Sequence, residues 1–388
     1  MNKLDKEKMY RQCAQCILDT DDSPTIEFNE AGICNYCLKY KEDEQKIVVH
    51  GEAGQRELER IVENVKRAGK KKQYDSLLGI SGGVDSSYLA LQAKKLGLRP
   101  LLVHFDNGWN SELAVDNIEK IISKLGFDLH TLVIPWEEFR DLQLAFLKAS
   151  VVDIEMVTDH AIIATLYKLA IKFNIKYILS GTNIVTEGIL PSNWIHFKGD
   201  HIHIQALQKQ FVGKPLKRYP LLTVRLRTLA LIRGVQTVSP LNYIHYNKDA
   251  TKAELKNEIG WRDYGGKHYE SVFTRFYQGY ILPTKFHIDK RKAHLSTLIC
   301  SHQISKEDAL LELSKPLYDE QQLRTDYDFV VKKLELTKGE FEEIMSAPPR
   351  PHTDYPVERE IYQRMPILKL IRPLWRLSKR VFFKHDQS

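Results

Sequence analysis

The strongest chemical signal in the sequence is one short stretch that reads Ser81-Gly82-Gly83-Val84-Asp85-Ser86-Ser87. Its adjacent glycines allow a tight bend and leave room for a ligand that a Cβ atom would exclude. The N–H groups of the turn and of the helix after it attract an anion, and the serine hydroxyls add donors. Asp85 is compatible with phosphate when a divalent cation such as Mg²⁺ lies between them. The stretch therefore predicts a phosphate site, with an ordinary Gly-Ser turn as the alternative.

This loop differs from two widespread nucleotide motifs, because it matches neither GxxxxGK[ST] nor GxGxxG. It resembles the SGGxDS pyrophosphate loop of the ATP pyrophosphatase enzymes. The resemblance implies that ATP binds here and is cleaved between its α and β phosphates. It also implies that an oxygen atom of the substrate becomes adenylylated.

Cysteine spacing gives a second signal. Four of the five cysteines form two CxxC pairs, Cys13 with Cys16 and Cys34 with Cys37. Each pair directs two thiolates at one metal, which suits a tetrahedral Zn²⁺ site, and Gly32 can supply a tight turn before the second pair. Disulfides are disfavoured in a reducing cytoplasm, and redox catalysis is the other alternative. We expect a zinc ribbon with an architectural role, since four protein ligands leave no position for water.

The elements that position the loop alternate between strand and helix patterns from residue 74 onward. Strands are expected at 76–80, 100–105, 131–134 and 177–179, with helices near 86–96 and 158–173. This alternation predicts an α/β fold with a Rossmann-like parallel sheet. The loop's resemblance implies the ATP pyrophosphatase type, also called adenine nucleotide alpha hydrolase-like. Further helices are expected at 52–67 and at 251–259, the latter with Thr251 as N-cap and Gly260 as its stop.

Two expected strands end in residues that would face the same ligand, because ligands of open parallel sheets lie beyond the carboxyl ends of the strands. Asp106 is expected to accept hydrogen bonds from the adenosine. Gly181 is expected to let the nucleotide approach the backbone. Each alone would be a routine strand-end turn, but together with the loop they outline an ATP site.

Residues 261–296 combine aromatic, cationic and paired glycine residues without a simple amphipathic stripe. Such a stretch suits a pocket for a polar, anionic substrate. Lys290 and Arg291 are catalytic candidates alongside Asp85, because they would neutralise the departing pyrophosphate and the charge that develops at the α phosphate. The alternative is a solvated basic helix face.

Composition and charge are ordinary for a globular protein of 388 residues, with 43% hydrophobic and 28% charged residues. The first residues lack an apolar core of a signal peptide, and no apolar run approaches a membrane span, so a cytoplasmic location is expected. The net charge is +7. Residues 364–384 contain seven cationic side chains and no acidic one, so this segment alone accounts for the whole excess. The remainder is formally neutral, which argues against a nucleic-acid partner.

The expected organisation has five parts. They are a zinc-ribbon-like module at 1–45, a charged helical connector at 46–72, an ATP pyrophosphatase domain at 73–260, a mostly helical substrate-binding and C-terminal region at 261–363, and a basic amphipathic tail at 364–388. Apolar residues interleave with the cations of this tail, so it suits a membrane-surface helix, which would give peripheral contact with the inner membrane. Two prolines interrupt the helix, and docking on the protein body is the alternative.

The cysteine motif, the loop and the stretches at 260–271 and 289–296 recur together in one family. The chain resembles the bacterial N-acetyl sugar amidotransferases of surface-polysaccharide biosynthesis over about residues 10 to 320. The resemblance implies conversion of an acetamido group to an acetamidino group on a nucleotide-linked sugar, such as a UDP-2,3-diacetamido uronic acid. It implies ammonia from a separate glutaminase subunit through a cyclase-like channelling subunit.

Two other functions fit the loop. One is a tRNA-modifying enzyme of the thiolation type, which often needs an active-site cysteine pair, whereas only Cys300 lies outside the expected zinc site. The other is an ATP-binding module without turnover. Asp85 and the cationic stretch at 285–292 favour chemistry over mere binding.

Overall fold

A computed structural model describes residues 10–49, 51–265 and 269–360. At its centre is a sheet of five parallel strands in the order β3-β2-β1-β4-β5. The strands are β1 (Ser76–Gly79), β2 (Pro100–Asp106), β3 (Leu129–Val133), β4 (Tyr177–Leu179) and β5 (Gln236–Val238). The chain runs outward from β1 to β3 and then returns to the other side of β1, which is the Rossmann order with a switch point between β1 and β4. The predicted parallel α/β sheet is confirmed.

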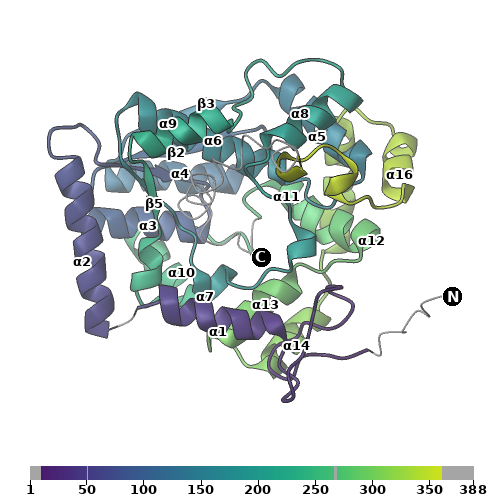
Figure 1. The fold of residues 1–388 in the computed structure, drawn as a ribbon, viewed down its shortest axis with the longest axis horizontal. Helices are drawn as coiled ribbons and strands as arrows, with labels where there is room; N and C mark the ends of the chain where they lie inside the picture. Colours follow the sequence, from purple (N-terminus) through teal and green to yellow (C-terminus); the bar gives the residue numbers. More distant parts are fainter. Residues whose placement is uncertain (1–9, 50, 266–268, 361–388) are drawn as a thin grey trace.

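Helices cover both faces of this sheet (Figure 1). The surrounding helices are α3 (Val84–Lys95), α4 (Glu112–Leu125), α5 (Trp136–Ala149), α6 (Met156–Lys172) and α9 (Val224–Ile232). Outside them, α8 (His201–Phe211) packs against α5, and α10 (Lys248–Ile259) packs against α3. Neighbouring strand residues face opposite cores, as the twofold period of a strand requires. Leu77 packs in one cluster with Ala164 and Tyr167 of α6, whereas Leu78 packs in another with Leu89 and Ala90 of α3.

Most expected elements are present, with small shifts at their ends. The edge strand β5 was not predicted, because Gln236-Thr237-Val238 is too short to show a strand pattern. The predicted N-cap at Thr251 is wrong: α10 begins three residues earlier, where the Asn247 side chain accepts a hydrogen bond from the backbone N–H of Ala250. Gly260 ends this helix in the left-handed conformation, as predicted.

The N-terminal part precedes the sheet with little regular structure and two helices, α1 (Asn35–Ile47) and α2 (Gly51–Ala68). Two isolated antiparallel bridges, Gln12 with Asp19 and Phe28 with Cys34, close its cysteine-bearing loops. Gly32 has a φ of +77°, which fits the predicted tight turn. The short helical segments α7 (Ile184–Glu187) and η1 (Ser192–Trp194) lie between β4 and β5, and η2 (Pro240–Tyr243) follows β5.

The described C-terminal region is helical, as predicted. Its elements are α11 (Val272–Phe276), η3 (Tyr277–Ile281), α12 (Leu282–Phe286), α13 (Arg291–Cys300), α14 (Lys306–Ser314), α15 (Glu320–Lys333), α16 (Lys338–Ser346) and η4 (His352–Asp354). The predicted amphipathic tail at 364–388 lies outside the described residues. Within the described ranges, no helix has the length and apolar character needed to cross a membrane.

Candidate functional site

The four cysteines of the two CxxC pairs meet in one buried cluster. Sulfur–sulfur distances are 3.9 Å for Cys13–Cys37, 3.8 Å for Cys16–Cys34 and 3.6 Å for Cys34–Cys37. Four thiolates at the usual 2.3 Å from a tetrahedral Zn²⁺ would stand about 3.8 Å apart, which matches this cluster. Backbone N–H groups of Cys16 and Cys34 donate to the Cys13 sulfur. The residues present therefore fit a structural zinc ion.

This cysteine cluster is attached to α13. The Sγ atom of Cys300, at the end of α13, lies 3.5 Å from Sγ of Cys37. Near the start of the helix, Lys292 pairs with Asp19 at 2.7 Å and with Asp22 at 3.1 Å. The N-terminal module thus contacts α13 at both of its ends, although the paired residues are 263 to 273 positions apart in the sequence.

The Ser81–Ser87 stretch forms a tight loop between β1 and α3, as predicted. Gly82 has a φ of +80°, and a Cβ atom there would lie 2.5 Å from the backbone oxygen of Ala114, so only glycine fits. The backbone N–H of Gly83 donates to Oγ of Ser81, and that of Val84 donates to the hydroxyl of Tyr264. The first N–H groups of α3 therefore lie among hydroxyls, at the positive end of the helix dipole.

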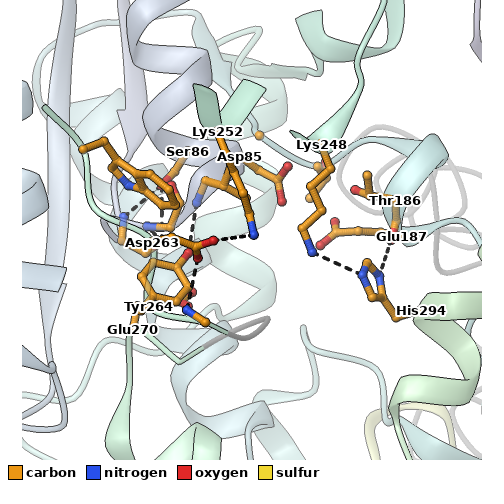
Figure 2. A pocket seen from close by; sticks show the side chains of 17 residues that line it. Asp85, Ser86, Thr186, Glu187, Lys248, Lys252, Asp263, Tyr264, Glu270 and His294 are labelled. Carbon is orange, nitrogen blue, oxygen red and sulfur yellow. Dashed lines mark hydrogen bonds and ion pairs between the residues drawn. The ribbon is translucent and has the colours of Figure 1, made fainter. Parts of the chain in front are cut away.

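A pocket opens over this loop (Figure 2). Its lining comes from the loop, the end of β4, α7, α10, α13 and the stretch after α10: Ser81, Gly83, Val84, Asp85, Ser86, Gly181, Thr182, Thr186, Glu187, Lys248, Lys252, Trp261, Asp263, Tyr264, Gly265, Glu270 and His294. Lys248 and Lys252 lie one turn apart on α10 and bring two ammonium groups to the pocket. Four carboxylates face them, so the pocket is mixed in charge. Such a site suits a polyphosphate accompanied by a divalent cation.

Asp85 is held in place from two sides of the fold. The hydroxyl of Tyr246 donates to Oδ1 of Asp85, and Nδ2 of Asn183 reaches the same oxygen at 3.5 Å. Burial, followed by the Asp85 charge, raises the pKa of Tyr246, so this hydroxyl stays protonated and remains a donor. The carboxylate is therefore oriented before any ligand arrives.

Most of the residues predicted to bind the nucleotide lie together around the pocket. Ser81, Gly83, Asp85, Ser86 and Gly181 line the pocket. A Cβ atom on Gly181 would lie 3.2 Å from the backbone carbon of Asp85, so this glycine also lets β4 end directly against α3.

Five other predicted residues lie outside this lining. Gly82 and Ser87 belong to the loop, but both are buried. Oδ1 of Asp106 accepts hydrogen bonds within its own strand-end turn, from the backbone N–H of Gly108 and from Nδ2 of Asn110. The guanidinium of Arg291 pairs with Asp289 and donates to carbonyl groups at the end of α14, a structural arrangement. Lys290, next to it, also lies away from the lining.

Several pocket residues were missed from the sequence. Glu187 and Lys248 line the pocket, and Tyr246 orients Asp85; they come from the segment between β4 and the first turn of α10, where no periodic pattern guided an assignment. The stretch at 261–271, which stays a predicted part of the substrate pocket, contacts the phosphate loop: Nε1 of Trp261 donates to the backbone oxygen of Gly82, and Glu270 lines the pocket. His294 joins α13 to the site, since Nδ1 contacts the Thr186 oxygen and Nε2 contacts Lys248.

A second group that could hold a metal consists of His196, His203 and His352, and these histidines already make hydrogen bonds within the protein. The backbone N–H of Asp153 donates to Nε2 of His352, Nδ1 of His352 lies 2.9 Å from Nε2 of His203, and Nδ1 of His203 contacts the Pro356 oxygen. The rings of His196 and His352 stack at 4.4 Å, so their in-plane lone pairs do not converge. We interpret His203 and His352 as links of a hydrogen-bonded chain in the core, and burial lowers the pKa of both.

Burial of neutral histidine predicts a specific dependence of stability on pH. Burial lowers the pKa of His160 to about 3 and that of His203 to about 4. In the unfolded chain each of these imidazoles binds a proton near pH 6.5, whereas in the folded chain it stays neutral until a much lower pH. Each histidine therefore contributes stability that is complete above pH 6.5 and is lost as pH falls toward its folded pKa. Between pH 7.5 and 5.5 the loss is about 1.4 kcal/mol per histidine.

The test compares the wild type with His160→Gln, since the Gln amide can also supply one donor and one acceptor. Urea unfolding at pH 7.5 and 5.5 should show a pH-dependent loss smaller by about 1.4 kcal/mol in the variant. The pH-dependent loss of the variant is subtracted from that of the wild type because other groups also titrate in this range. Burial raises the pKa of Glu155 to about 7 and that of Asp22 to about 6, and both shifts favour the folded state as pH falls. Equal losses in the two proteins would contradict the prediction.

Comparison with known proteins adds a family match. Residues 270–369 match the family model described as LPS biosynthesis protein WbpG-like, C-terminal domain. No curated protein matches the chain. Glu270 and His294, which line the pocket, both fall within the matched residues.

Solved structures give only distant likenesses. An NH3-dependent NAD synthetase from Campylobacter jejuni is 14% identical, with a TM-score of 0.30, and the match covers 69% of this chain and 99% of that one. An NMN synthetase from Francisella tularensis is 15% identical, with a TM-score of 0.29 and coverage of 61% and 92%. A predicted subunit of a tRNA methyltransferase from Methanocaldococcus jannaschii is 16% identical, with a TM-score of 0.26 and coverage of 47% and 75%. We base no functional inference on scores this low.

The family match bears directly on the resemblance seen in the sequence. It covers Glu270 and the helix α13, which brings His294 to the pocket, and its description names LPS biosynthesis. Residues 270–369 are therefore similar to the C-terminal domain of WbpG-like proteins of LPS biosynthesis, which supports the predicted relationship to a surface-polysaccharide family over this part of the chain.

Proposed function

We propose that the protein is an ATP-dependent amidotransferase that converts an N-acetyl group of a nucleotide-linked sugar to an acetamidino group. The substrate would be a sugar such as a UDP-2,3-diacetamido uronic acid, in O-antigen or capsule biosynthesis. The observation that carries the proposal is one shared pocket, in which the SGGVDSS loop faces Glu270 and His294 of the WbpG-like domain.

The chemistry explains why ATP is needed. An amide carbonyl is a poor electrophile, but adenylylation of its oxygen gives an imidate with AMP as the leaving group. In this reaction the N–H groups of the Ser81–Ser87 loop would bind the pyrophosphate, and Lys248 and Lys252 would offset the charge that develops on it. Ammonia then adds to the imidate carbon and AMP departs.

Two metals enter the proposal. Asp85 and Glu187, both in the pocket lining, are oxygen ligands of the kind that Mg²⁺ binds together with phosphates. Bound Mg²⁺ would neutralise phosphate charge beside these carboxylates. Zn²⁺ would be structural, held by the four clustered cysteines, and would take no part in the reaction.

The ammonia supply is proposed to be external. A glutaminase of the cysteine type needs a reactive, accessible thiol. Four of the five cysteines form the metal cluster, and Cys300 is 4% exposed and lies against Cys37. This arrangement supports a separate glutaminase subunit and a cyclase-like channelling subunit as partners. The synthesis of surface polysaccharide precursors gives the predicted tail a reason to contact the inner membrane.

The test is a reconstituted reaction. The full chain is incubated with ATP, Mg²⁺, an ammonium salt and a UDP-diacetamido uronic acid, and AMP release is followed together with the mass of the sugar. We expect AMP only when the sugar is present, and a product in which NH replaces one oxygen. A matched sugar with free amino groups in place of acetamido groups should release no AMP. AMP release with tRNA but not with the acetylated sugar would overturn the proposal.

A further inference from the structure

A second cluster of charged side chains lies on the same edge of the sheet as the phosphate loop. It surrounds the beginning of α6, a helix that runs back to the start of β4 and so has its N-terminus at the carboxyl edge of the strands. A hydrogen bond of 3.3 Å from Nδ2 of Asn107, just after β2, to Oγ1 of Thr158 fixes that N-terminus at this edge.

Part of this cluster is internally neutralised. Nζ of Lys198 pairs with Asp153 at 2.7 Å and with Asp159 at 3.0 Å. The carboxylate of Asp153 is buried, whereas the Asp159 side chain retains 46% of its exposure. The cluster is therefore open to solvent on the side of Asp159.

Two other members are not neutralised within the described part of the chain. Oγ1 of Thr274 donates to Oε2 of Glu155 at 2.7 Å, and the other carboxylate oxygen of Glu155 has no hydrogen-bond partner there. The ammonium of Lys290 has neither a hydrogen bond nor an ion pair with any described residue. Burial, followed by the Lys198 charge, lowers the pKa of Lys290, while burial raises that of Glu155 to about 7. Both residues are half-buried, and neither unpaired atom is fully enclosed, so both groups are accessible to a ligand.

Helix α13 connects this cluster to the nucleotide pocket. Lys290 is the residue before the first turn of α13, and its backbone is already helical. His294, which lines the pocket, is four residues further on. Residues at this spacing lie on one face of a helix, with Cβ atoms about 6 Å apart. A ligand that reaches from the α phosphate past His294 would therefore meet Lys290.

We infer that Lys290 and Glu155 form the acceptor end of the active site, where Lys290 binds an anionic group of the amide-bearing acceptor and Glu155 transfers protons during the addition of ammonia. The inference rests on the proposed function. As the bond between the ammonia nitrogen and the imidate carbon forms, Glu155 takes one proton from that nitrogen. It returns the proton to the sugar nitrogen as the carbon–oxygen bond breaks and its electron pair leaves with AMP. Atoms and charge balance without any further reactant.

The acceptor class follows from the charges. Lys198 is occupied by two carboxylates, so Lys290 is the cation left for a ligand among the described members of this cluster. A single ammonium with a carboxyl group beside it suits a carboxylate that also carries hydrogen-bonding hydroxyl or amide groups, as on a uronic acid. A diphosphate would add more charge than Lys290 offsets, and the Ser81–Ser87 loop already provides for phosphate.

The test separates the two half-reactions, which are adenylylation of the amide oxygen and addition of ammonia to the imidate. Glu155→Gln should retain sugar-dependent exchange of pyrophosphate into ATP within about threefold and lose at least about 30-fold in amidine formation with ammonium, in the range of one general acid–base residue. Lys290→Met should raise KM for the uronic acid sugar by at least about tenfold, as expected for one lost ion pair to a buried charge, with KM for ATP unchanged. Glu137→Gln on α5 and Lys168→Met on α6 are matched exposed controls.

The outcomes distinguish this inference from the proposed function. If the wild type shows no sugar-dependent exchange at all, the proposed function fails. If the wild type is active and both variants match their controls, the inference is overturned while the proposed function stands. Loss of both half-reactions in Glu155→Gln, with an unchanged melting temperature, would also overturn its role in ammonia addition, because it would place Glu155 in adenylylation.

Discussion

A chain in which asparagine replaces Asp85 is expected to fold normally and to lose at least about 100-fold in AMP formation, the usual effect of removing one preorganised electrostatic group. The carboxylate lies in the first turn of α3, directly after the phosphate loop, and hydrogen bonds from Tyr246 and Asn183 fix one of its oxygens. Asparagine has nearly the same shape but no charge. It would keep the position and lose the ability to share a cation with the phosphates.

The control for this substitution is Tyr246→Phe. It removes the hydroxyl that orients Asp85 and leaves the charge in place, so AMP formation should fall by only about tenfold, the value of one hydrogen bond to a charged group. Steady-state AMP release at several Mg²⁺ concentrations is the measurement, and Asp85→Asn should need more Mg²⁺ to reach its lower maximum. Activity of Asp85→Asn within threefold of the wild type would contradict a catalytic role.

The parts of this site whose positions agree with the sequence prediction are those encoded in consecutive residues. The glycine pair, Asp85 and the following helix start are one local unit, and CxxC spacing defines the cysteine cluster through short turns. Strands β1, β2 and β4 are apolar runs with clear ends. In each case the physical requirement, such as the positive φ of Gly82, is met by residues next to one another.

The parts that the sequence did not predict depend on long-range contacts or on helix direction. The hydroxyl of Tyr264 accepts a hydrogen bond from the N–H of Val84, 180 positions away in the sequence, and no local pattern predicts that contact. Lys290, Arg291 and Lys292 appeared to be one basic group. Because successive residues of a helix point about 100° apart, Lys290 faces the cluster at α6, Arg291 caps α14, and Lys292 pairs with the N-terminal module.

Removal of the predicted zinc ion should destabilise the protein well beyond its N-terminal module. Structural Zn²⁺ supplies folding free energy of about 10 kcal/mol in isolated zinc modules. Cys34→Ser, which removes one of four ligands, should lower the zinc content well below one per chain and lower the melting temperature by about 10 °C or more. Metal analysis and thermal unfolding measure both effects. Cys300→Ala is the matched control, because its sulfur contacts the cluster but lies outside the four ligands.

The effect should also reach the nucleotide pocket through α13. Lys292 and Cys300 tie this helix to the cysteine module, and His294 between them contacts Thr186 and Lys248 in the pocket. If the module unfolds, α13 loses these supports, and ATP affinity should fall in Cys34→Ser even though Cys34 is not in the pocket lining. Lys292→Met should weaken ATP binding less and keep its zinc. A Cys34→Ser variant that retains one zinc per chain, or binds ATP as tightly as Cys300→Ala, would show that the cysteine module does not position the helix.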